Sequence, residues 1–590
     1  MDPNVLVFGR PTPPPAMIPL RAGPLTLEFD PESGSVRYVE LPDGTEAVRA
    51  VYPSLRGPDW STATPEVRDL KVDAREDGFS VSFALAYENG YAARVSVEGG
   101  PEGVGYAYEG EAKEGFDTDR TGLCVLHPIS LADEPLEIRH PDGTRESGRF
   151  PDLVQPDWPF RDIAGISVKL PGYKVDVTIE GEVFEMEDQR NFGDASYKTY
   201  CYPQTRPFPY RIVAGERVTQ TVRIKATPWG SRVEGLPPMP DGVAGLLFVD
   251  ETLPVPLIGL GADASTDRRL LAAAPVDYLR MPALEAEDVG LPLELALDLA
   301  EDAEARVVQA LERINALPEP PERVIVTPVK AKAHVDALRN GMDEVLVLVG
   351  GSDLGALNRS DLKADEADGV AFGFHPQSHL FDDQTLFENV ESLPDLVATA
   401  AERTEGPIIV GPVRLGGAPD PRTGSLLFAA WLVAALASLA RSDVDAITLF
   451  DLQGDDGLFR EGRPIPAYHV LADLHEYADG DLVIGVGTAR RAAGFGLVLD
   501  ESFRAIVANL TPSPLRLSVV AAGDGPHVVK VMDGDNVERA VTDAASWRAE
   551  AGETILPEEG TIEVEIGAYG VARIDAEVDN LEEGENLSSA

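Results

Sequence analysis

The chain switches between two kinds of hydrophobic pattern, and the switches divide it into three parts. From about Leu25 to Lys225, short runs such as VSFALAY and VDVTIEG alternate apolar and polar residues, with turns rich in Gly, Pro and Asp between them. A period of two is typical of half-buried strands, so this part predicts an all-β, sandwich-like domain over residues 1–235. The Pro- and Gly-rich segment 226–242 is the expected linker.

After residue 242 the pattern changes to continuous apolar strands, each followed by a loop and then, in most units, a segment with helical spacing. In EDAEARVVQALERINAL, for example, apolar residues recur every three or four positions, as they do in amphipathic helices. Strands that alternate with helices are typical of a parallel sheet covered on both faces, and eight such units over residues 243–480 predict a closed (β/α)8 barrel. The expected strands are 256–261, 277–281, 293–299, 323–328, 345–350, 370–374, 407–413 and 446–452.

The alternating pattern returns from residue 481 to 577, in runs such as FGLVLD and LRLSVVAA, and predicts a small C-terminal β-sandwich. We expect the acidic tail, 578–590, to be disordered. The expected fold class is therefore multidomain α/β and all-β, with a central TIM barrel between two β domains. The apolar run 426–440 is shorter than the ~20 residues that a membrane span needs, and we interpret it as a buried helix.

Acidic residues outnumber basic residues two to one in this 590-residue chain, and the formal net charge is −50. Such a surface repels nucleic acids and anionic membranes, so neither is an expected partner. We interpret the charge as a solvated, halophilic-type acidic surface that salt screens. Two cysteines, Cys124 and Cys201, are too few for a disulfide framework, and the start of the chain has no secretory signal pattern. We therefore expect a cytoplasmic protein.

The stretch FHPQSHLFDD, 374–383, combines His375, Gln377 and His379 directly after the sixth expected strand. The active site of a barrel of this kind lies at the carboxyl ends of its strands, so these side chains are candidates for catalysis. We expect Asp383 to cap the helix that follows. Other polar residues that follow strands are Asp298, Asp353, Arg414, Asp451, Asp455 and Asp456.

Three reaction classes suit such a site. A retaining glycosidase needs two carboxylates roughly 5–5.5 Å apart. A resemblance to the large group of barrel glycosidases would imply glutamates after the fourth and seventh strands, but the ends of these expected strands, VTPVKA and VGPVRL, have no carboxylate. A metal-dependent hydrolase could use His375, His379 and nearby aspartates as ligands to activate water, although the spacing matches no metal signature. Hydrolysis of an ester or lactone without metal needs only a base, donors for the oxyanion and an acid.

A second polar stretch, EMEDQRNFGDASYK at 185–198, is too polar for an ordinary sandwich strand. Its donors and acceptors suit a polyhydroxylated carboxylate, and Arg190 could clamp a carboxyl group. The alternative is a salt-bridged loop that packs the β domain onto the barrel. The residues in question are Glu187, Asp188, Arg190, Asn191, Asp194 and Lys198.

These two stretches resemble the D-apionate lactonases, bacterial enzymes that open the lactone of a branched sugar acid. FEMEDQRNFGDASYKTYC, 184–201, is similar almost residue for residue to a signature of that family, and HPQSHLFDD, 375–383, resembles its Asn-Pro-Gln-x-His-x-Phe-Asp-Asp pattern. The order of the domains and AYHVLADLHEYADG, 467–480, also resemble that family. The resemblance implies a carboxylic ester hydrolase that acts on a sugar-acid lactone of the D-apionolactone type.

The sequence departs from the family pattern in two loops of the barrel. ALNR, Ala356 to Arg359, stands where the family has Glu-Leu-Asn-Arg, and DLQGDDG, 451–457, stands where it has Glu-Thr-x-Gly-Trp-Arg-Gly. The first glutamate is missing and the second is replaced by the shorter Asp451. A glycoside hydrolase-like enzyme and a non-catalytic relative that binds carbohydrate or a sugar acid therefore remain alternatives.

The resulting hypothesis assigns a role to each candidate. His379 or Asp353 deprotonates water, Gln377 and backbone donors hold the oxyanion, and Asp451 protonates the departing ring oxygen. No cofactor is predicted, a divalent metal remains possible, and the oligomeric state is not predicted. The expected substrate-binding residues are His375, Asp382, Glu187, Asp188, Arg190, Asn191, Lys198, Asn358 and Arg359.

Overall fold

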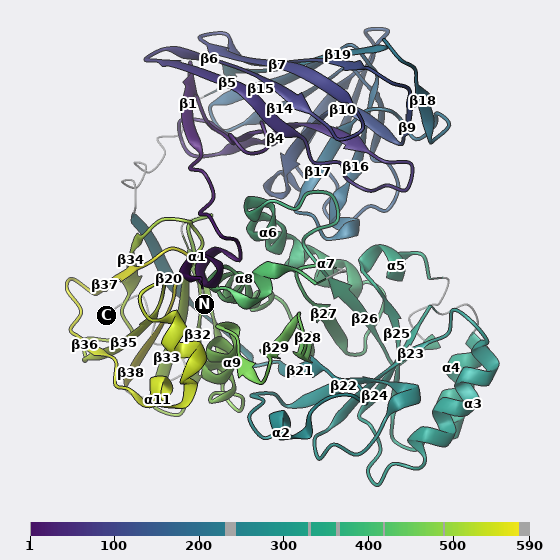
Figure 1. Ribbon diagram of the computed structural model, residues 1–590, viewed down its shortest axis with the longest axis vertical. Helices are drawn as coiled ribbons and strands as arrows, with labels where there is room; N and C mark the ends of the chain where they lie inside the picture. The colour runs from purple at the N-terminus through teal and green to yellow at the C-terminus, as the bar shows by residue number, and fades with distance from the viewer. Residues whose placement is uncertain are drawn as a thin grey trace. The chain divides into compact units, whose positions relative to one another are not determined.

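The computed structural model describes residues 2–230, 243–328, 332–360, 366–416, 419–487 and 490–577, and its contacts divide the chain into two compact units (Figure 1). One unit contains residues 15–191 and 195–238. The other contains residues 1–14, 192–194 and 239–590. Residues 192–194 therefore belong with the barrel. Part of the expected linker, 231–242, and the expected disordered tail, 578–590, lie outside the described residues.

The first unit is an all-β domain of two large antiparallel sheets, as the alternating pattern predicts (Figure 1). Its strands bury every second side chain, as in β15, and side chains from both sheets, such as Phe29 and Tyr106, share one core. One sheet has the order β1 (Ile18–Ala22), β2 (Leu25–Phe29), β3 (Val36–Glu40), β4 (Glu46–Arg56), β10 (Arg120–Pro128), β17 (Ser196–Tyr200), β16 (Phe184–Asp188) and β13 (Phe160–Ile163). The other has the order β12 (Arg145–Arg149), β11 (Pro135–Arg139), β14 (Gly165–Leu170), β15 (Tyr173–Glu180), β19 (Arg217–Pro228), β8 (Gly103–Ala112), β7 (Tyr91–Gly100), β6 (Gly78–Ala86) and β5 (Glu66–Arg75). A small third sheet pairs β18 (Tyr210–Ile212) with β9 (Phe116–Thr118).

The second unit contains the predicted barrel. Each strand pairs in parallel with the next, and β21 pairs with β28 in the register Leu257↔Ala446, which closes the ring. The eight expected strands are confirmed, and no end differs from the expected one by more than one residue. They are β21 (Leu257–Gly261), β22 (Tyr278–Pro282), β23 (Leu293–Asp298), β24 (Arg323–Thr327), β25 (Leu346–Gly351), β26 (Gly369–Phe374), β27 (Ile408–Val413) and β28 (Ala446–Gln453).

Helices follow most of the barrel strands, but only the short turn η3 (Ala283–Glu285) lies between β22 and β23. The expected buried helix is α8 (Leu426–Leu439), in which every side chain except that of Ser438 is buried. None of the described helices is both long and apolar enough to cross a membrane. Two short 3-10 turns, η5 (Val390–Ser392) and η6 (Pro421–Gly424), lie in the loops after β26 and β27, and two short strands, β29 (Gly457–Arg460) and β30 (Arg463–Pro464), follow β28. The other barrel helices are α2 (Arg268–Leu271), α3 (Ala303–Ile314), α4 (Lys332–Gly341), α5 (Leu354–Asn358), α6 (Asp383–Asn389), α7 (Leu393–Ala401) and α9 (Ala467–His475).

A charged network that the hydrophobic pattern did not predict lies among the barrel strands. The fully buried Glu294 of β23 pairs with Arg280 of β22 and, at 2.6 Å, with Arg323 of β24. Thr448 of β28 donates a hydrogen bond to the same carboxylate at 2.7 Å. A buried charge is tolerated only when it is paired in this way, because removal from water is otherwise very unfavourable.

The C-terminal β domain is confirmed, but its strands form one continuous sheet. That sheet has the order β36 (Glu553–Ile555), β35 (His527–Met532), β38 (Val571–Glu577), β33 (Ser502–Asn509), β32 (Ala492–Leu499), β31 (Asp481–Gly487), β20 (Val243–Pro254), β34 (Leu515–Val520) and β37 (Thr561–Ile566). Residues of β35 and β37, near opposite edges, share one core, so the sheet is strongly curved. The first strand after residue 242, β20, therefore lies with the C-terminal strands.

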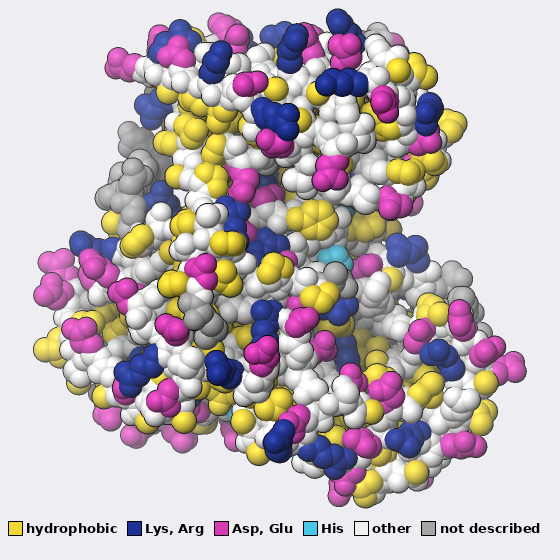
Figure 2. Space-filling model, viewed as in Figure 1, with side chains coloured by type: hydrophobic (Ala, Val, Ile, Leu, Met, Phe, Trp, Pro, Cys, Tyr) yellow, Lys and Arg dark blue, Asp and Glu magenta, His cyan; other side chains and the backbone are white. Residues whose placement is uncertain are grey.

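Ion pairs join this sheet to the last barrel helix, α9. Arg504 of β33 bonds to Glu476 after α9 and to Asp575 of β38, each at 2.6 Å. Arg548 of α11 (Ala544–Ala549) bonds to Asp473 of α9 at 2.8 Å. The neighbouring helix is α10 (Val537–Thr542), and α1 (Pro3–Phe8) packs on α8 and α10. On the visible face in Figure 2, Asp and Glu side chains are spread widely and interspersed with Lys and Arg.

Candidate active site

Polar side chains follow four neighbouring barrel strands at their carboxyl ends. Asp353 follows β25, His375 follows β26, Arg414 follows β27 and Asp451 lies near the end of β28. Burial lowers the pKa of His375; Asp194 and Asp353 raise it, and Arg414 lowers it. One imidazole therefore lies within electrostatic range of several charged groups at the end of the barrel where active sites form.

The second histidine of the stretch, His379, is paired with a carboxylate. Its Nδ1 lies 2.6 Å from Oδ2 of Asp194, and the imidazole side chain is 16% exposed. Asn389 of α6 donates from Nδ2 to the other oxygen of Asp194 at 2.9 Å and to the carbonyl of Pro376 at 2.7 Å. The carboxylate is held on both sides, and it fixes the orientation of the ring.

The chain segment that carries Asp194 is built into the barrel unit by its neighbours. The carbonyl of Phe192 accepts a hydrogen bond from Ser378 at 2.7 Å, and the Phe192 ring meets the His379 ring edge to face. Gly193 has a φ of +90°, and a Cβ there would lie 3.3 Å from the carbonyl oxygen of His375. The left-handed backbone favours glycine at this position, and the close approach leaves little room for a side chain.

The Asp451 carboxylate lies over β21. A Cβ on Gly261, the last residue of β21, would lie 2.3 Å from Oδ1 of Asp451, so the absence of a side chain there makes room for the carboxylate. Although the carboxylate is open to solvent, surrounding protein raises its pKa. Asp456 and Asp263 raise the pKa further, whereas Arg414 lowers it. Such a group holds a proton more readily than an ordinary aspartate.

Arg414 is half-buried between these groups. Its backbone N–H bonds to the carbonyl of Phe374, and within the described residues its guanidinium has neither a hydrogen bond nor an ion pair. It lies within electrostatic range of both His375 and Asp451. Its donors suit an oxyanion or a carboxylate, as a guanidinium fork generally does.

Three expected roles in the stretch 374–383 need correction. The amide of Gln377 donates to the carbonyl of Leu415 and to Asp420, each at 2.8 Å, so both of its hydrogens are used and none is left for an oxyanion. Asp382, expected to bind substrate, caps α6 by accepting from the backbone N–H of Thr385. Asp383, expected to be that cap, is the first residue of the helix and pairs with Arg422 at 2.9 Å.

Asp353 has a structural role as well, because it caps α5: its carboxylate accepts a hydrogen bond from the backbone N–H of Ala356 at 2.6 Å. Asn358 ends α5, and the exposed Arg359 follows it. Asp298 accepts from the backbone of Ala300 at 2.8 Å, as a turn residue does. Of the acidic residues after β28, Asp455 is exposed, and Asp456 accepts from the backbone N–H of Asp420 at 2.9 Å.

In the stretch 185–198, two residues expected to bind substrate are instead sealed in the β domain. Arg190 and Asp188 form an ion pair at 2.8 Å with no exposed side-chain surface, and Arg190 also donates to the carbonyls of Pro151 and Asp152. Arg190 therefore cannot clamp a substrate carboxylate. Density of polar residues does not distinguish a binding loop from a buried ion pair.

The other residues of that stretch that were expected to bind substrate also lie within the β domain. Glu187 and Lys198 face each other across β16 and β17 and pair at 3.1 Å, and Asn191 is buried. Only Asp194, one of the six residues noted, reaches the candidate site. Asn389, which fixes it, was missed, because a single asparagine within a helical pattern gives no signal of its own.

Within the described residues, no group of three or more His, Cys, Asp or Glu side chains is arranged to hold a metal ion. His375 and His379 therefore have no ligand set around them in the described part of the chain. Cys124 and Cys201 are both buried in the β domain.

The fold and the site define a TIM-barrel protein with a β domain before and after the barrel in sequence and a histidine–carboxylate pair at the barrel mouth. Its sequence matches the D-apionate lactonase N-terminal domain over residues 5–228, the TIM barrel domain over 276–418 and 417–479, and the C-terminal immunoglobulin-like domain over 489–574. The chain belongs to the D-apionate lactonase family. The predicted resemblance is confirmed.

A curated relative, the D-apionate lactonase of Brucella anthropi, is 27% identical; the match covers 75% of this chain and 84% of that protein. Among solved structures, a GH30 endoxylanase from Clostridium papyrosolvens aligns with 9% identity and a TM-score of 0.40, and an alpha-L-arabinofuranosidase from Thermotoga maritima with 12% identity and a TM-score of 0.43. Each alignment covers 57% of this chain and 100% of the other chain. Scores this low carry no argument about activity.

Proposed function

We propose that this protein hydrolyses the lactone of a sugar acid, of the D-apionolactone type, to the free aldonate. The observation that carries the proposal is the His379–Asp194 pair at the barrel mouth, within the unit that also contains Arg414 and Asp451. Family membership and the curated relative, which is named a D-apionate lactonase, support the substrate class.

In the proposed mechanism, His379 is the general base. Asp194 accepts the hydrogen bond from Nδ1–H, so the other ring nitrogen, Nε2, takes the proton from water. The water oxygen then attacks the lactone carbonyl carbon, and the C=O electron pair moves to the oxygen as an oxyanion. A carboxylate that orients the imidazole and stabilises its protonated form is a recurrent feature of such catalysis.

Arg414 and Asp451 act on the other two atoms of the reacting group. The Arg414 guanidinium stabilises the negative oxygen of the tetrahedral intermediate. When the bond to the ring oxygen breaks, Asp451 protonates the alkoxide, so the lactone and water give one hydroxy acid. Surrounding protein raises the pKa of Asp451, which favours the protonated form that this role needs.

The test is a panel of aldonolactones and glycosides, assayed with and without chelator. We expect acid release from one or more lactones above the spontaneous rate. Reducing sugar from glycosides alone would identify a glycosidase, and binding of sugar acids without turnover would identify a non-catalytic relative. A rate that falls with chelator and returns with added divalent metal would show that the metal-free mechanism is wrong.

A further inference from the structure

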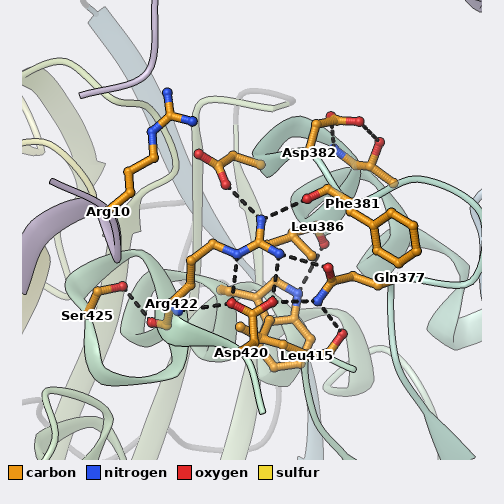
Figure 3. A network of polar contacts seen from close by, with 12 residues as sticks. Arg10, Gln377, Phe381, Asp382, Leu386, Leu415, Asp420, Arg422 and Ser425 are labelled. Carbon is orange, nitrogen blue, oxygen red and sulfur yellow. Dashed lines mark hydrogen bonds and ion pairs between the residues drawn. The ribbon is translucent and has the colours of Figure 1, made fainter. Parts of the chain in front are cut away.

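Arg422, close to the candidate site, makes many hydrogen bonds, and the proposed mechanism does not use it. Arg422 of η6 donates from Nε and Nη2 to the two oxygens of Asp420 at 2.9 and 2.7 Å (Figure 3). It also donates from Nη2 to Oε1 of Gln377 at 2.8 Å. From Nη1 it donates to the carbonyl of Phe381 and to Asp383, each at 2.9 Å. All five N–H groups of the guanidinium are therefore used.

Three of these contacts lie on the chain segment that carries His379. Gln377 precedes the histidine by two residues, and Phe381 and Asp383 follow it by two and four. Gln377 is held a second time, by the carbonyl of Leu415 and by Asp420. The Asp194 carboxylate fixes the imidazole ring, whereas Arg422 holds the segment on both sides of it.

The same cluster reaches the loop after β28. Asp456 accepts hydrogen bonds from the backbone N–H of Asp420 at 2.9 Å and from the hydroxyl of Thr423 at 3.2 Å. Asp456 is also one of the charges that raise the pKa of Asp451. Residues 420–423 therefore link the loop of the proposed base to the loop of the proposed acid.

Lysine cannot replace Arg422 in this cluster. An ammonium group has three donors around one point, whereas the planar guanidinium supplies five donors in a fixed fork. Both Asp420 and Asp383 are partly desolvated, and the pKa of Asp383 is raised by burial although Arg422 opposes the shift. Without the fork, two buried carboxylates lose part of their neutralisation, and the segment 377–383 loses contacts at both ends.

We propose that Arg422 is a positioning residue that holds the 377–383 segment so that His379 meets Asp194, and that couples this segment to the loop of Asp451. The proposal rests on the proposed function for its kinetic consequences. Its structural consequence, the state of the His379 imidazole, can be measured without any substrate.

The experiment compares wild type with Arg422→Lys by kinetics and by NMR of labelled histidine. The chain has only eight histidines, and the spectrum of His379→Gln assigns the resonance. We expect Arg422→Lys to lower kcat about 10–100-fold with KM changed less than about threefold, because misplacement of about 1 Å has effects of this size. The titration midpoint of His379 should fall relative to wild type, because an imidazolium that loses its contact with the Asp194 carboxylate is less stable.

Arg504→Lys is the matched control, since Arg504 is also a buried arginine with several carboxylate partners but lies in the C-terminal sheet. It should lower the melting temperature and leave kcat and the His379 titration unchanged. If Arg422→Lys does not fold, Asp383→Ala removes the acceptor of one Nη1 hydrogen bond and should move both readouts in the same direction by less.

Folded Arg422→Lys with an unchanged His379 midpoint would overturn the proposal, whatever happens to turnover. A shifted midpoint in a protein that hydrolyses no lactone would support the positioning role and refute the proposed function. The positioning role of Arg422 and the proposed function can therefore be refuted independently of each other.

Discussion

Asp194→Asn isolates the contribution of the carboxylate to catalysis with almost no change of shape. Asp194 now accepts hydrogen bonds on both oxygens, from His379 at 2.6 Å and from Asn389 at 2.9 Å. An asparagine has only one acceptor oxygen, and its NH2 group must face one of these two donors. Either His379 shifts to the wrong tautomer, or Asn389 loses its acceptor and the side chain moves.

The size of the effect follows from the bond that is lost. A hydrogen bond to a charged group contributes about 1.5–3 kcal/mol, and each 1.4 kcal/mol changes a rate about tenfold. If the whole free energy of this hydrogen bond stabilises the transition state, its loss should lower kcat about 10–100-fold. KM should change little, because the Asp194 side chain contacts protein groups on both oxygens.

The assay is the initial rate of acid release at saturating lactone, with thermal unfolding recorded in parallel. Asp445→Asn is the control, because Asp445 is also a hydrogen-bond acceptor, here of the backbone N–H of Ile408 at 2.8 Å, but precedes β28 at the opposite end of the barrel. We expect the control to keep wild-type kcat. Wild-type kcat in folded Asp194→Asn would refute the role of Asp194 and remove the support for His379 as the base.

Three further predictions concern Asp451, Arg414 and two buried histidines. Asp451→Asn should lower kcat about 10²–10⁴-fold for alkyl lactones and much less for aryl lactones, whose leaving group needs no acid; equal losses for both would rule out Asp451 as the acid. Arg414→Gln should lower kcat about 10²–10³-fold and move the pH limb of Asp451 upward, because Arg414 lowers that pKa; an unmoved limb would contradict the assignment. Burial lowers the pKa of His127 and of His469 to about 4, below the ordinary value near 6.5. The folded state therefore binds fewer protons than the unfolded chain between these values, and stability should fall by about 2 kcal/mol per histidine from pH 7 to pH 5, measured by urea unfolding; a flat profile in that range would contradict it.

The barrel could be predicted from the sequence because each strand is a continuous apolar run bounded by turns, and eight such runs have few other arrangements. The barrel segment was predicted to begin at residue 243, whereas β20 pairs with the C-terminal strands, because a run of apolar residues does not show which sheet it joins. The network around Glu294 was also missed, since a single acidic residue in an apolar strand gives no information about the two arginines that neutralise it.

The roles of the candidate site residues stay predictions, but their place in the fold could be predicted. Barrel topology fixes where strand ends gather, so the sequence places His375 and His379 after β26 at that end of the barrel. Asp194 lies 185 residues before His379 in sequence, so their pairing depends on tertiary structure. The sequence also could not show that Arg190 and Gln377 have protein partners, because a polar residue in a loop gives the same sequence signal whether its side chain binds substrate or protein.

The most direct test of the account is the rate of acid release from a D-apionolactone-type lactone by wild type and by His379→Ala, with lactone binding measured on both. The account predicts wild-type hydrolysis far above the spontaneous rate, at least about a hundredfold loss in the variant, and retained binding. Wild-type hydrolysis at the spontaneous rate, or near-normal turnover by the variant, would contradict it.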